Sequence, residues 1–145
     1  MLPHQFTPHV VARIAPAIAQ EASRLLEMCT QGRYSEVRFD EAYDVWVTDG
    51  GVGYELERFS GGERDMVHLA IRLGISRLLA SRSGGAGLRF LALDEVFASL
   101  DREHRELVLA ALHSITSLYD QVLAITHTDA LQEALDNAIQ VQLVD

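Results

Sequence analysis

The stretch that most limits how this chain can fold is residues 90–93, an unbroken apolar run followed at once by Asp94 and Glu95. A short apolar run bounded by loop residues is typical of a strand buried on both faces of a parallel sheet. Carboxylates at the end of such a strand are costly to desolvate unless something compensates their charge. Ligands bind at the carboxyl ends of strands in open α/β sheets. The pattern therefore indicates a site where one acid holds Mg²⁺ and the other activates a water, or, more simply, a helix cap followed by a solvated acid.

The rest of the chain alternates between helix and strand patterns. We expect residues 1–9 to be a disordered or non-native lead-in, and residues 10–32 to form an amphipathic helix that Gln31 and Gly32 end. Residues 33–59 alternate with a period of two and predict an antiparallel meander with a hairpin turn at Gly50 and Gly51. Further patterns predict a helix over 63–80, a strand over 89–93, a helix over 102–119, a strand over 121–126, a helix over 129–135 and a strand over 138–144. This order predicts an α/β fold whose mostly parallel sheet is flanked by helices.

The composition excludes several classes of function. All 12 basic residues are arginine, and a Walker A loop needs a lysine, so the chain cannot cradle nucleotide phosphates in that way by itself. A formal net charge of −9 makes it a poor nucleic-acid binder on its own. Cys29 is the single cysteine, which excludes a disulfide framework and favours the cytoplasm. We find no apolar segment long enough for a bilayer and no signal peptide, and expect no membrane partner.

Two consecutive glycines, Gly61 and Gly62, stand at the entrance of the helix predicted from Glu63. Ser60 and Glu63 have the spacing of a capping box, which is the structural interpretation. The glycines also let another backbone or a phosphate approach closely, and the helix start would attract an anion. The residues alone leave both interpretations open.

Two further polar residues have both a structural and a functional interpretation. His127 follows the strand predicted over 121–126, and it is either a loop histidine or a hydrogen-bond donor to a terminal phosphate. Asp101 precedes a predicted helix, and it is either the N-cap of that helix or an acid at a contact between subunits.

The order of these segments resembles that of ABC-type ATPases. Residues 59–63 resemble their signature motif, 90–95 their Walker B motif, 99–101 their D-loop and 126–127 their H-loop. The text GRYSEVRFDEAYDVWV followed by FSGGERDMVHLAIRLGISRLLA is similar to the C-terminal half of the head of SbcC-type DNA-repair ATPases, the Rad-fifty relatives of the SMC proteins. The resemblance runs from about Ala17 to the end. In that family a long coiled coil splits the head, and the N-terminal half carries Walker A.

The resemblance implies roles for the signature and Walker B residues. Ser60, Gly61 and Gly62 would contact the γ-phosphate of ATP held by an opposite head, and the resemblance counts Glu63 and Asp101 with them among the residues of the nucleotide site. Asp94 would support Mg²⁺, Glu95 would be the general base, and His127 would sense the γ-phosphate.

Other residues would act at the interface or depart from the family pattern. Asp101 would cross the interface between two heads. Arg72 matches an arginine that switches partners when ATP binds, although a solvated helix charge explains it as well. Phe59 replaces the common leucine, and Val96 stands where the family often has proline. Neither departure touches a polar role.

The resemblance further implies that residues 10–32 are the helix next to the coiled coil and that 33–145 form the C-terminal lobe of the head. With its N-terminal lobe and a second identical head, this lobe would hydrolyse ATP to control an SbcD-type nuclease and DNA binding by the assembled complex. The chain alone would be inactive. It would lie in the cytoplasm, on the nucleoid in a bacterium, or in the nucleus of a eukaryote. A chromosome-organising SMC head and a non-catalytic interaction module are the alternatives, whereas a transporter ATPase would keep Walker A in the same chain.

Overall fold

The computed structural model describes residues 6–82, 90–94, 100–116, 119–126, 137 and 139, with side chains from residue 13 onward except at 103, 111, 114 and 115. The elements are α1 (Phe6–Cys29), β1 (Tyr34–Phe39), β2 (Val45–Asp49), β3 (Val52–Glu55), the 3-10 turn η1 (Leu56–Arg58), α2 (Gly61–Arg82), β4 (Phe90–Asp94), α3 (Arg102–Thr116) and β5 (Gln121–Ile125). The glycine-rich connection at 83–87 and the helix predicted over 129–135 lie outside the described residues. So does the strand predicted over 138–144, apart from Ile139.

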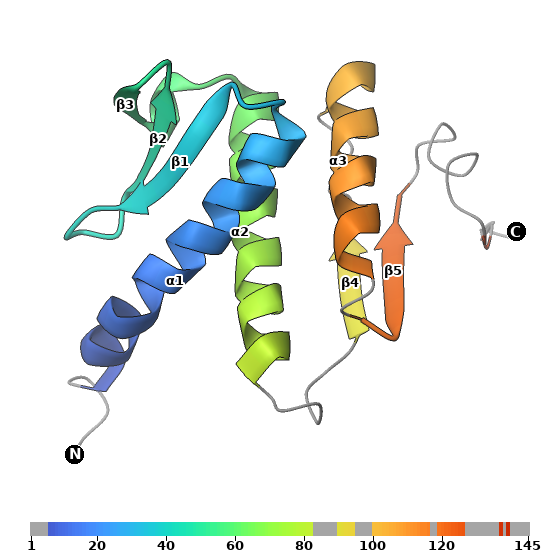
Figure 1. The fold of residues 1–145 in the computed structure, drawn as a ribbon, viewed down its shortest axis with the longest axis horizontal. Coiled ribbons are helices and arrows are strands. Elements are labelled where there is room, and N and C mark those ends of the chain that lie inside the picture. Colours follow the sequence, from blue (N-terminus) through green and yellow to red (C-terminus); the bar gives the residue numbers. More distant parts are fainter. Residues whose placement is uncertain are drawn as a thin grey trace, which may run out of the picture.

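The described elements form two groups (Figure 1). In one group, α1 packs along α2, and the antiparallel sheet in the order β1-β2-β3 lies at one end of this helix pair. In the other, β4 and β5 pair in parallel, and α3 connects them in the sequence. A parallel pair of strands requires such a crossover. The predicted α/β fold, with a leading helix and a small antiparallel meander, is confirmed.

The first helix is longer than its sequence pattern predicts. It begins at Phe6, so residues 6–9, predicted as part of a disordered lead-in, form its first turn, and Pro16 lies inside it. Its predicted apolar face is confirmed where side chains are described, with Leu25 and Leu26 almost wholly buried. Gln31 and Gly32 both have positive φ, and the Gly32 N–H donates to the carbonyl oxygen of Glu27 at 2.8 Å. This is the hydrogen bond of a Schellman helix end, as the sequence predicts.

The meander has the hairpin turn that its sequence predicts. Gly50 and Gly51, between β2 and β3, have φ of 59° and 83°, the backbone that a tight hairpin requires. Although the period-two pattern runs through residue 43, β2 begins at Val45, because the backbone of Tyr43 is left-handed with φ of 67°. The Asp40 carboxylate accepts the N–H groups of residues 42 and 44 at 2.9 Å each. These bonds make a local turn that competes with strand pairing.

A bulge in β1 decides which side chains of that strand face the core. The pairing of β1 with β2 shifts between Tyr34 and Glu36. Tyr34 and Val37 are three positions apart, and both are only 1% exposed. A regular strand would place residues three apart on opposite faces. The bulge therefore turns the Tyr34 ring into the protein.

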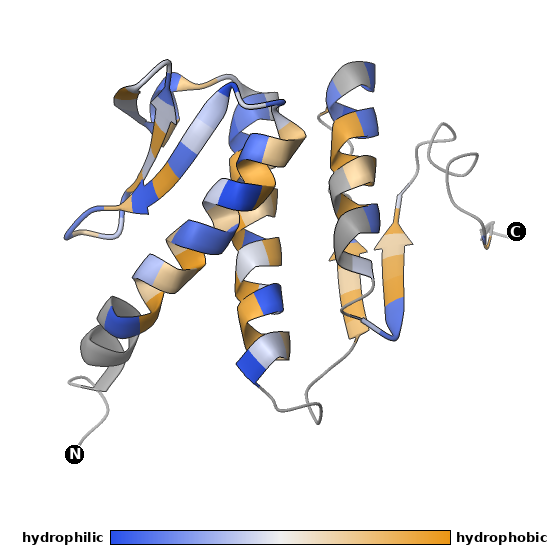
Figure 2. Cartoon of the chain, in the orientation of Figure 1, coloured by the Kyte–Doolittle hydropathy of each residue, from blue (hydrophilic) through white to orange (hydrophobic). Residues whose placement is uncertain are grey.

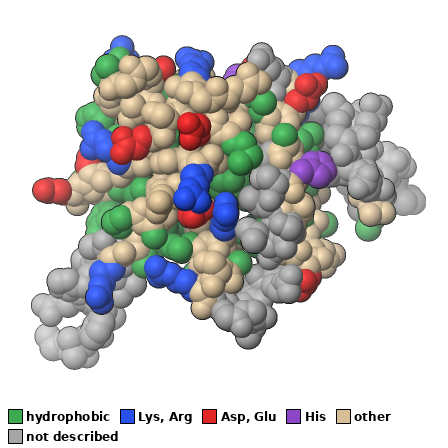
Figure 3. Space-filling model, viewed as in Figure 1, with side chains coloured by type: hydrophobic (Ala, Val, Ile, Leu, Met, Phe, Trp, Pro, Cys, Tyr) green, Lys and Arg blue, Asp and Glu red, His purple; other side chains and the backbone are tan. Residues whose placement is uncertain are grey.

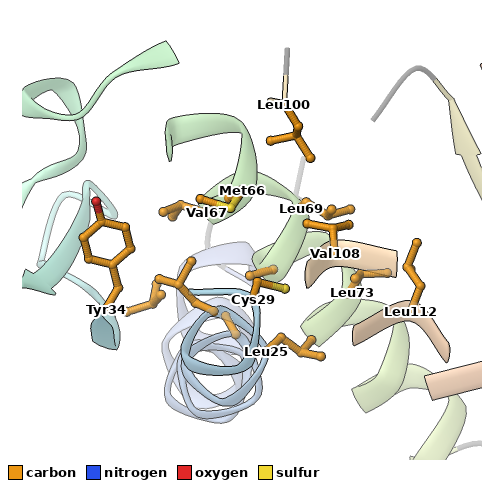
Figure 4. Packing of buried hydrophobic residues seen from close by; sticks show 14 of the residues in the cluster. Leu25, Cys29, Tyr34, Met66, Val67, Leu69, Leu73, Leu100, Val108 and Leu112 are labelled. Atoms are coloured by element: carbon orange, nitrogen blue, oxygen red, sulfur yellow. The ribbon is translucent and has the colours of Figure 1, made fainter. Parts of the chain in front are cut away.

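The core is one cluster that runs through both groups of elements. Leu25 of α1, Tyr34 of β1 and Leu73 of α2 belong to it, together with Val108 and Leu112 of α3 (Figure 4). On α2 the buried residues are Met66, Val67, Leu69, Ala70, Leu73 and Gly74. This apolar stripe packs α2 against its neighbours, as its sequence pattern predicts. None of the described helices is both long and apolar enough to cross a membrane.

The strands β4 and β5 are covered on one face only. Leu91 and Leu93 of β4 are buried in the core cluster, whereas Phe90 is 42% exposed. On β5, Leu123 is 43% and Ile125 51% exposed, and both strands are apolar over most of their length (Figure 2). The prediction that residues 90–93 are buried on both faces is therefore wrong for the described part of this chain. A parallel sheet normally has a layer on each face.

Candidate functional site

The start of α2 is held by a complete capping box. The N–H and the hydroxyl of Ser60 both donate to Oε2 of Glu63, at 2.9 Å and 2.7 Å, and the Glu63 N–H faces Ser60 Oγ at 3.4 Å. The first bond of the helix ladder runs from the Arg64 N–H to the Ser60 carbonyl oxygen at 2.9 Å. The structural interpretation of the Ser60–Glu63 spacing is confirmed.

The other oxygen of Glu63 faces away from Ser60 toward the junction of α1 and β1. The Tyr34 hydroxyl donates to Oε1 of Glu63, and the Arg33 guanidinium lies 3.2 Å from the same oxygen. The hydrogen bond from Tyr34 lowers the pKa of the Glu63 carboxyl to about 2, with help from Ser60 and the Arg33 charge and against the effect of burial. Glu63 is thus a carboxylate bound at both oxygens.

Arg33 and Tyr34 received no site role from the sequence. They stand in the text GRYSEV, whose alternation predicts a strand, and a strand pattern does not tell what a buried tyrosine hydroxyl contacts. Both the burial of the ring and Glu63 raise the pKa of Tyr34. The hydroxyl therefore stays protonated and acts as a donor.

The hydrogen bonds of the capping box involve Ser60 and Glu63, and the N–H groups of Gly61 and Gly62 take no part in them. Gly61 and Gly62 precede Arg64, whose N–H makes the first bond of the ladder, and donors at this position have no partner inside a helix. A Cβ at Gly61 would meet no atom within 4 Å, and Ser60 is exposed. Exposed donors at a positive helix end suit a phosphate. The described residues thus fit the predicted anion site.

Phe59, which departs from the family pattern, has aromatic neighbours. Its ring meets the Tyr34 ring edge-on with centroids 5.4 Å apart, and the Tyr54 ring with centroids 6.5 Å apart. Edge-to-face pairs of this kind are favourable beyond their buried area. The Phe59 ring thus links the residue before Ser60 to β1 and β3 through packing alone.

Asp94 ends β4 and is exposed. It pairs in register with Ile125, the last residue of β5, so the carboxyl ends of the two strands meet at one edge of the sheet. Among the residues that the structure describes, no three His, Cys, Asp or Glu side chains gather as a metal site. A single carboxylate fits Mg²⁺ where water and phosphate oxygens supply the other ligands. Glu95 and His127, the predicted base and phosphate sensor, lie outside the described residues.

Asp101 caps α3. Its Oδ1 accepts the N–H of His104 at 2.9 Å, and both of its oxygens lie 2.8 Å from Nδ1 of the same histidine. The N-cap interpretation is confirmed. The carboxylate is exposed, and its role at an interface between heads stays a prediction.

Arg72 lies on α2 and is exposed, as expected for a polar residue outside the buried stripe. Further along the helix, Arg77 lies 3.4 Å from the Glu21 carboxylate of α1. The role of Arg72 as a switch stays a prediction.

Comparison with known proteins finds a family and several relatives. The SbcC/RAD50-like, Walker B motif family model matches residues 32–114. The chain is 31% identical over 135 residues to a DNA double-strand break repair Rad50 ATPase of Methanopyrus kandleri, covering 90% of this chain and 15% of the relative. It is 30% identical over 132 residues to the SbcC component of the nuclease SbcCD of Staphylococcus saprophyticus, covering 86% of this chain and 13% of the relative. The chain thus spans only a small part of these relatives.

Solved structures show the same fold. A chain from work on ATP-driven dimerization and DNA-stimulated activation of SMC ATPases superimposes with a TM-score of 0.74 at 20% identity, over 95% of this chain and 84% of that chain. The SMC head domain from Thermotoga maritima gives a TM-score of 0.62 at 22% identity, over 89% of this chain and 45% of that chain. The fold is therefore that of part of an SMC-type ATPase head.

Proposed function

We propose, because this chain belongs to the SbcC/RAD50-like Walker B family, that it supplies the C-terminal lobe of an ATPase head in a DNA double-strand-break repair protein. The relatives named as a Rad50 ATPase and as the SbcC component of SbcCD support this assignment. A second segment, which carries the Walker A lysine that this chain lacks, completes the head. Two such heads bind ATP between them, and hydrolysis controls an SbcD-type nuclease.

The start of α2 carries the proposal. Ser60, which is exposed, and the backbone N–H groups of Gly61 and Gly62 bind the γ-phosphate of a nucleotide held by the opposite head, and the space around Gly61 is open. The positive end of α2 stabilises the negative charge there. Binding a phosphate in this way requires no lysine, which agrees with the composition of the chain.

The Walker B edge supplies the catalytic side chains. Asp94 would hold Mg²⁺ through its water shell, and the bound ion would supply positive charge beside the phosphates. Glu95 takes a proton from the attacking water, and His127 donates a hydrogen bond to the γ-phosphate. Asp101 contacts the opposite head across the interface. The same carboxylate caps the start of α3.

The completing lobe covers the open face of β4 and β5. Phe90, Leu123 and Ile125 are large apolar side chains between 42% and 51% exposed, on strands that pair in parallel. Burying such a face is favourable in proportion to the apolar area removed from water. We place the Walker A lobe on it.

DNA is held by the assembled complex and not mainly by this lobe. The net charge of −9 opposes phosphate binding, and acidic and basic side chains are interspersed on the face seen in Figure 3. We propose that the protein works in the cytoplasm, on the nucleoid in a bacterium, or in the nucleus of a eukaryote.

The Glu95→Gln variant tests the function. The chain is combined with the Walker A segment of the same protein, and ATP binding, head dimerisation and turnover are measured. Glu95→Gln should bind ATP and dimerise but stall, because an amide cannot accept the proton. Glu106→Gln, a matched change on α3, should turn over normally. Normal turnover in Glu95→Gln would remove Glu95 as the base, and a wild-type head without turnover would refute the function.

A chromosome-organising head is the second candidate, because the solved structures with this fold are SMC heads. Another SMC head with a similar fold is bound to the C-terminal winged-helix domain of ScpA. Co-purification of the complete protein separates the two functions. A nuclease in the complex supports repair, and a ScpA-like protein supports chromosome organisation.

A further inference from the structure

A line of hydrogen bonds connects the end of α1 to the start of α2. The buried Thr30 hydroxyl donates to the Leu26 carbonyl oxygen at 2.8 Å and accepts the Tyr34 N–H at 3.1 Å. The Tyr34 hydroxyl donates to one oxygen of Glu63, and the other oxygen of Glu63 accepts from Ser60. The position of the Ser60 side chain therefore depends on residues some thirty positions before it in the sequence.

Phosphate binding at Ser60 conflicts with the contact that Ser60 makes in this structure. A serine hydroxyl carries one proton, and here it points to Glu63 Oε2 at 2.7 Å. A phosphate oxygen that accepts a hydrogen bond from this hydroxyl must displace the carboxylate as its acceptor. A free carboxylate at that point would also repel the phosphate, since like charges a few ångströms apart interact strongly where water is excluded.

Arg33 and Tyr34 are placed to resolve this conflict. Both contact Oε1 of Glu63, the oxygen turned away from Ser60, and so hold the carboxylate toward β1. The Tyr34 ring is fixed by the bulge in β1 and by the edge of Phe59. Arg33 lies over the Tyr34 ring at 4.8 Å and also faces Asp49 at 3.8 Å.

We propose that Arg33 and Tyr34 are positioning residues for the signature end of α2: they retain the Glu63 carboxylate, so that the Ser60 hydroxyl passes from Glu63 to the terminal phosphate when ATP binds. The proposal rests on the proposed function. According to this proposal, Arg33 and Tyr34 do not touch the nucleotide. They set the ATP concentration that the head needs for half-maximal turnover.

The first test compares Tyr34→Phe with Tyr54→Phe in the head combined with its Walker A segment. Tyr34→Phe keeps the ring packed on Phe59 and removes only the donor to Glu63. It should raise the ATP concentration for half-maximal turnover by about five-fold or more, because a hydrogen bond to a charged group is lost, and leave kcat within about two-fold. Tyr54→Phe, the same change on the other ring beside Phe59, should alter neither value. A loss in kcat alone would overturn the proposal.

Arg33→Gln supplies a second arm, with Arg38→Gln as its control. Arg38 stacks on Trp46 at 4.5 Å as Arg33 stacks on Tyr34, so both variants lose a similar contact. Arg33→Gln should raise the half-maximal ATP concentration by a smaller factor than Tyr34→Phe, because Arg33 is 57% exposed and solvent screens its charge. Equal effects of the two arginine variants would count against the proposal.

A double variant distinguishes positioning from simple loss of structure. Glutamine keeps the capping box, so Glu63→Gln removes the repulsive charge without removing the cap. In the Glu63→Gln background, Tyr34→Phe should change the half-maximal ATP concentration by less than about two-fold. If the factors for the two substitutions simply multiply, Tyr34 does not act through the Glu63 charge and the proposal fails.

A measurement without nucleotide keeps this proposal separate from the proposed function. In the 145-residue chain, NMR follows the titration of the Glu63 carboxyl and the exchange rate of the Ser60 amide. Tyr34→Phe should raise both the Glu63 pKa and the exchange rate, and Tyr54→Phe should raise neither. If the combined head does not hydrolyse ATP, the proposed function fails, while these two shifts still decide whether Tyr34 positions the cap. If Tyr34→Phe changes neither the Glu63 pKa nor the Ser60 amide exchange rate, the proposal that Tyr34 is a positioning residue is overturned.

Discussion

Gly74 of α2 lies against the backbone of α1 at Ala22, so closely that a Cβ on Gly74 would come within 3.0 Å of the Ala22 nitrogen. The same Cβ would meet the Ile18 carbonyl oxygen and the Glu21 Cβ, each at 3.4 Å. Gly74 and Ala22 are both buried, and the small size of both residues lets the two helices come close together. This contact sets the spacing between the helix that precedes the meander and the helix that begins at the signature.

Gly74→Ala should therefore destabilise the chain, although alanine is the better helix former. The added methyl must move one helix away from the other, which costs about 1–3 kcal/mol, more than the roughly 1 kcal/mol that alanine gains in an open helix. Gly61→Ala is the matched control in the same helix, because its Cβ would meet no atom within 4 Å. Urea unfolding measures both. A Gly74→Ala variant as stable as Gly61→Ala would refute the close packing.

Acid should weaken the chain through Glu63. Its pKa is lowered from 4.5 to about 2 in the folded protein, so the unfolded chain binds more protons between these values. The stabilisation is present above about pH 5 and is lost as the pH falls toward 2. Comparing urea unfolding of wild type and Glu63→Gln isolates this residue. The difference in unfolding free energy between wild type and Glu63→Gln should become smaller as the pH falls. A difference that does not change with pH would contradict the prediction.

Cys29 should resist thiol reagents while the chain is folded. The side chain is 4% exposed, and burial raises the pKa of the thiol to about 11. The thiolate is the reactive form, so labelling at about pH 8 should require unfolding. As the single cysteine, Cys29 reports the opening of α1 from the core without interference. Immediate and complete labelling in native buffer would show that this end of α1 is not packed as described.

Two substitutions of Asp101 distinguish its role as the N-cap of α3 from its role at the interface between heads. Asp101→Ala removes the cap on α3 and should cost about 1 kcal/mol in unfolding free energy, whereas Asp101→Asn keeps an oxygen for the His104 N–H and should cost little. In the combined head, Asp101→Asn should nevertheless weaken ATP-driven dimerisation, because the charge is lost at the interface. Normal dimerisation in Asp101→Asn would leave the cap as the only role of this residue.

The sequence predicts much of the fold because the relevant signals are local. The turn at Gly50 and Gly51, the helix end at Gly32 and the cap formed by Ser60 and Glu63 each depend on a few neighbouring residues. The open face of β4 and β5 was not predictable in this way. An apolar run indicates that a strand will be buried, and it does not tell whether the covering layer belongs to the same chain.

The motif residues of the site were predictable from the sequence, but the residues that hold them in position were not. Ser60 and Glu63 were found from their spacing, but the second oxygen of Glu63 binds Arg33 and Tyr34, about thirty residues earlier in the sequence. The bulge in β1 that turns Tyr34 inward breaks the period-two pattern from which a strand is predicted. Contacts of this kind depend on the packing of α1, β1 and α2 together.

The most direct test of the account is ATP turnover by this chain alone and after addition of the Walker A segment of the same protein. We predict no turnover from the 145-residue chain, which has no lysine to reach the phosphates, and Mg²⁺-dependent turnover once the segment is added. Turnover by the chain alone, or none by the combined head, would contradict the assignment of this chain as half of an ATPase head.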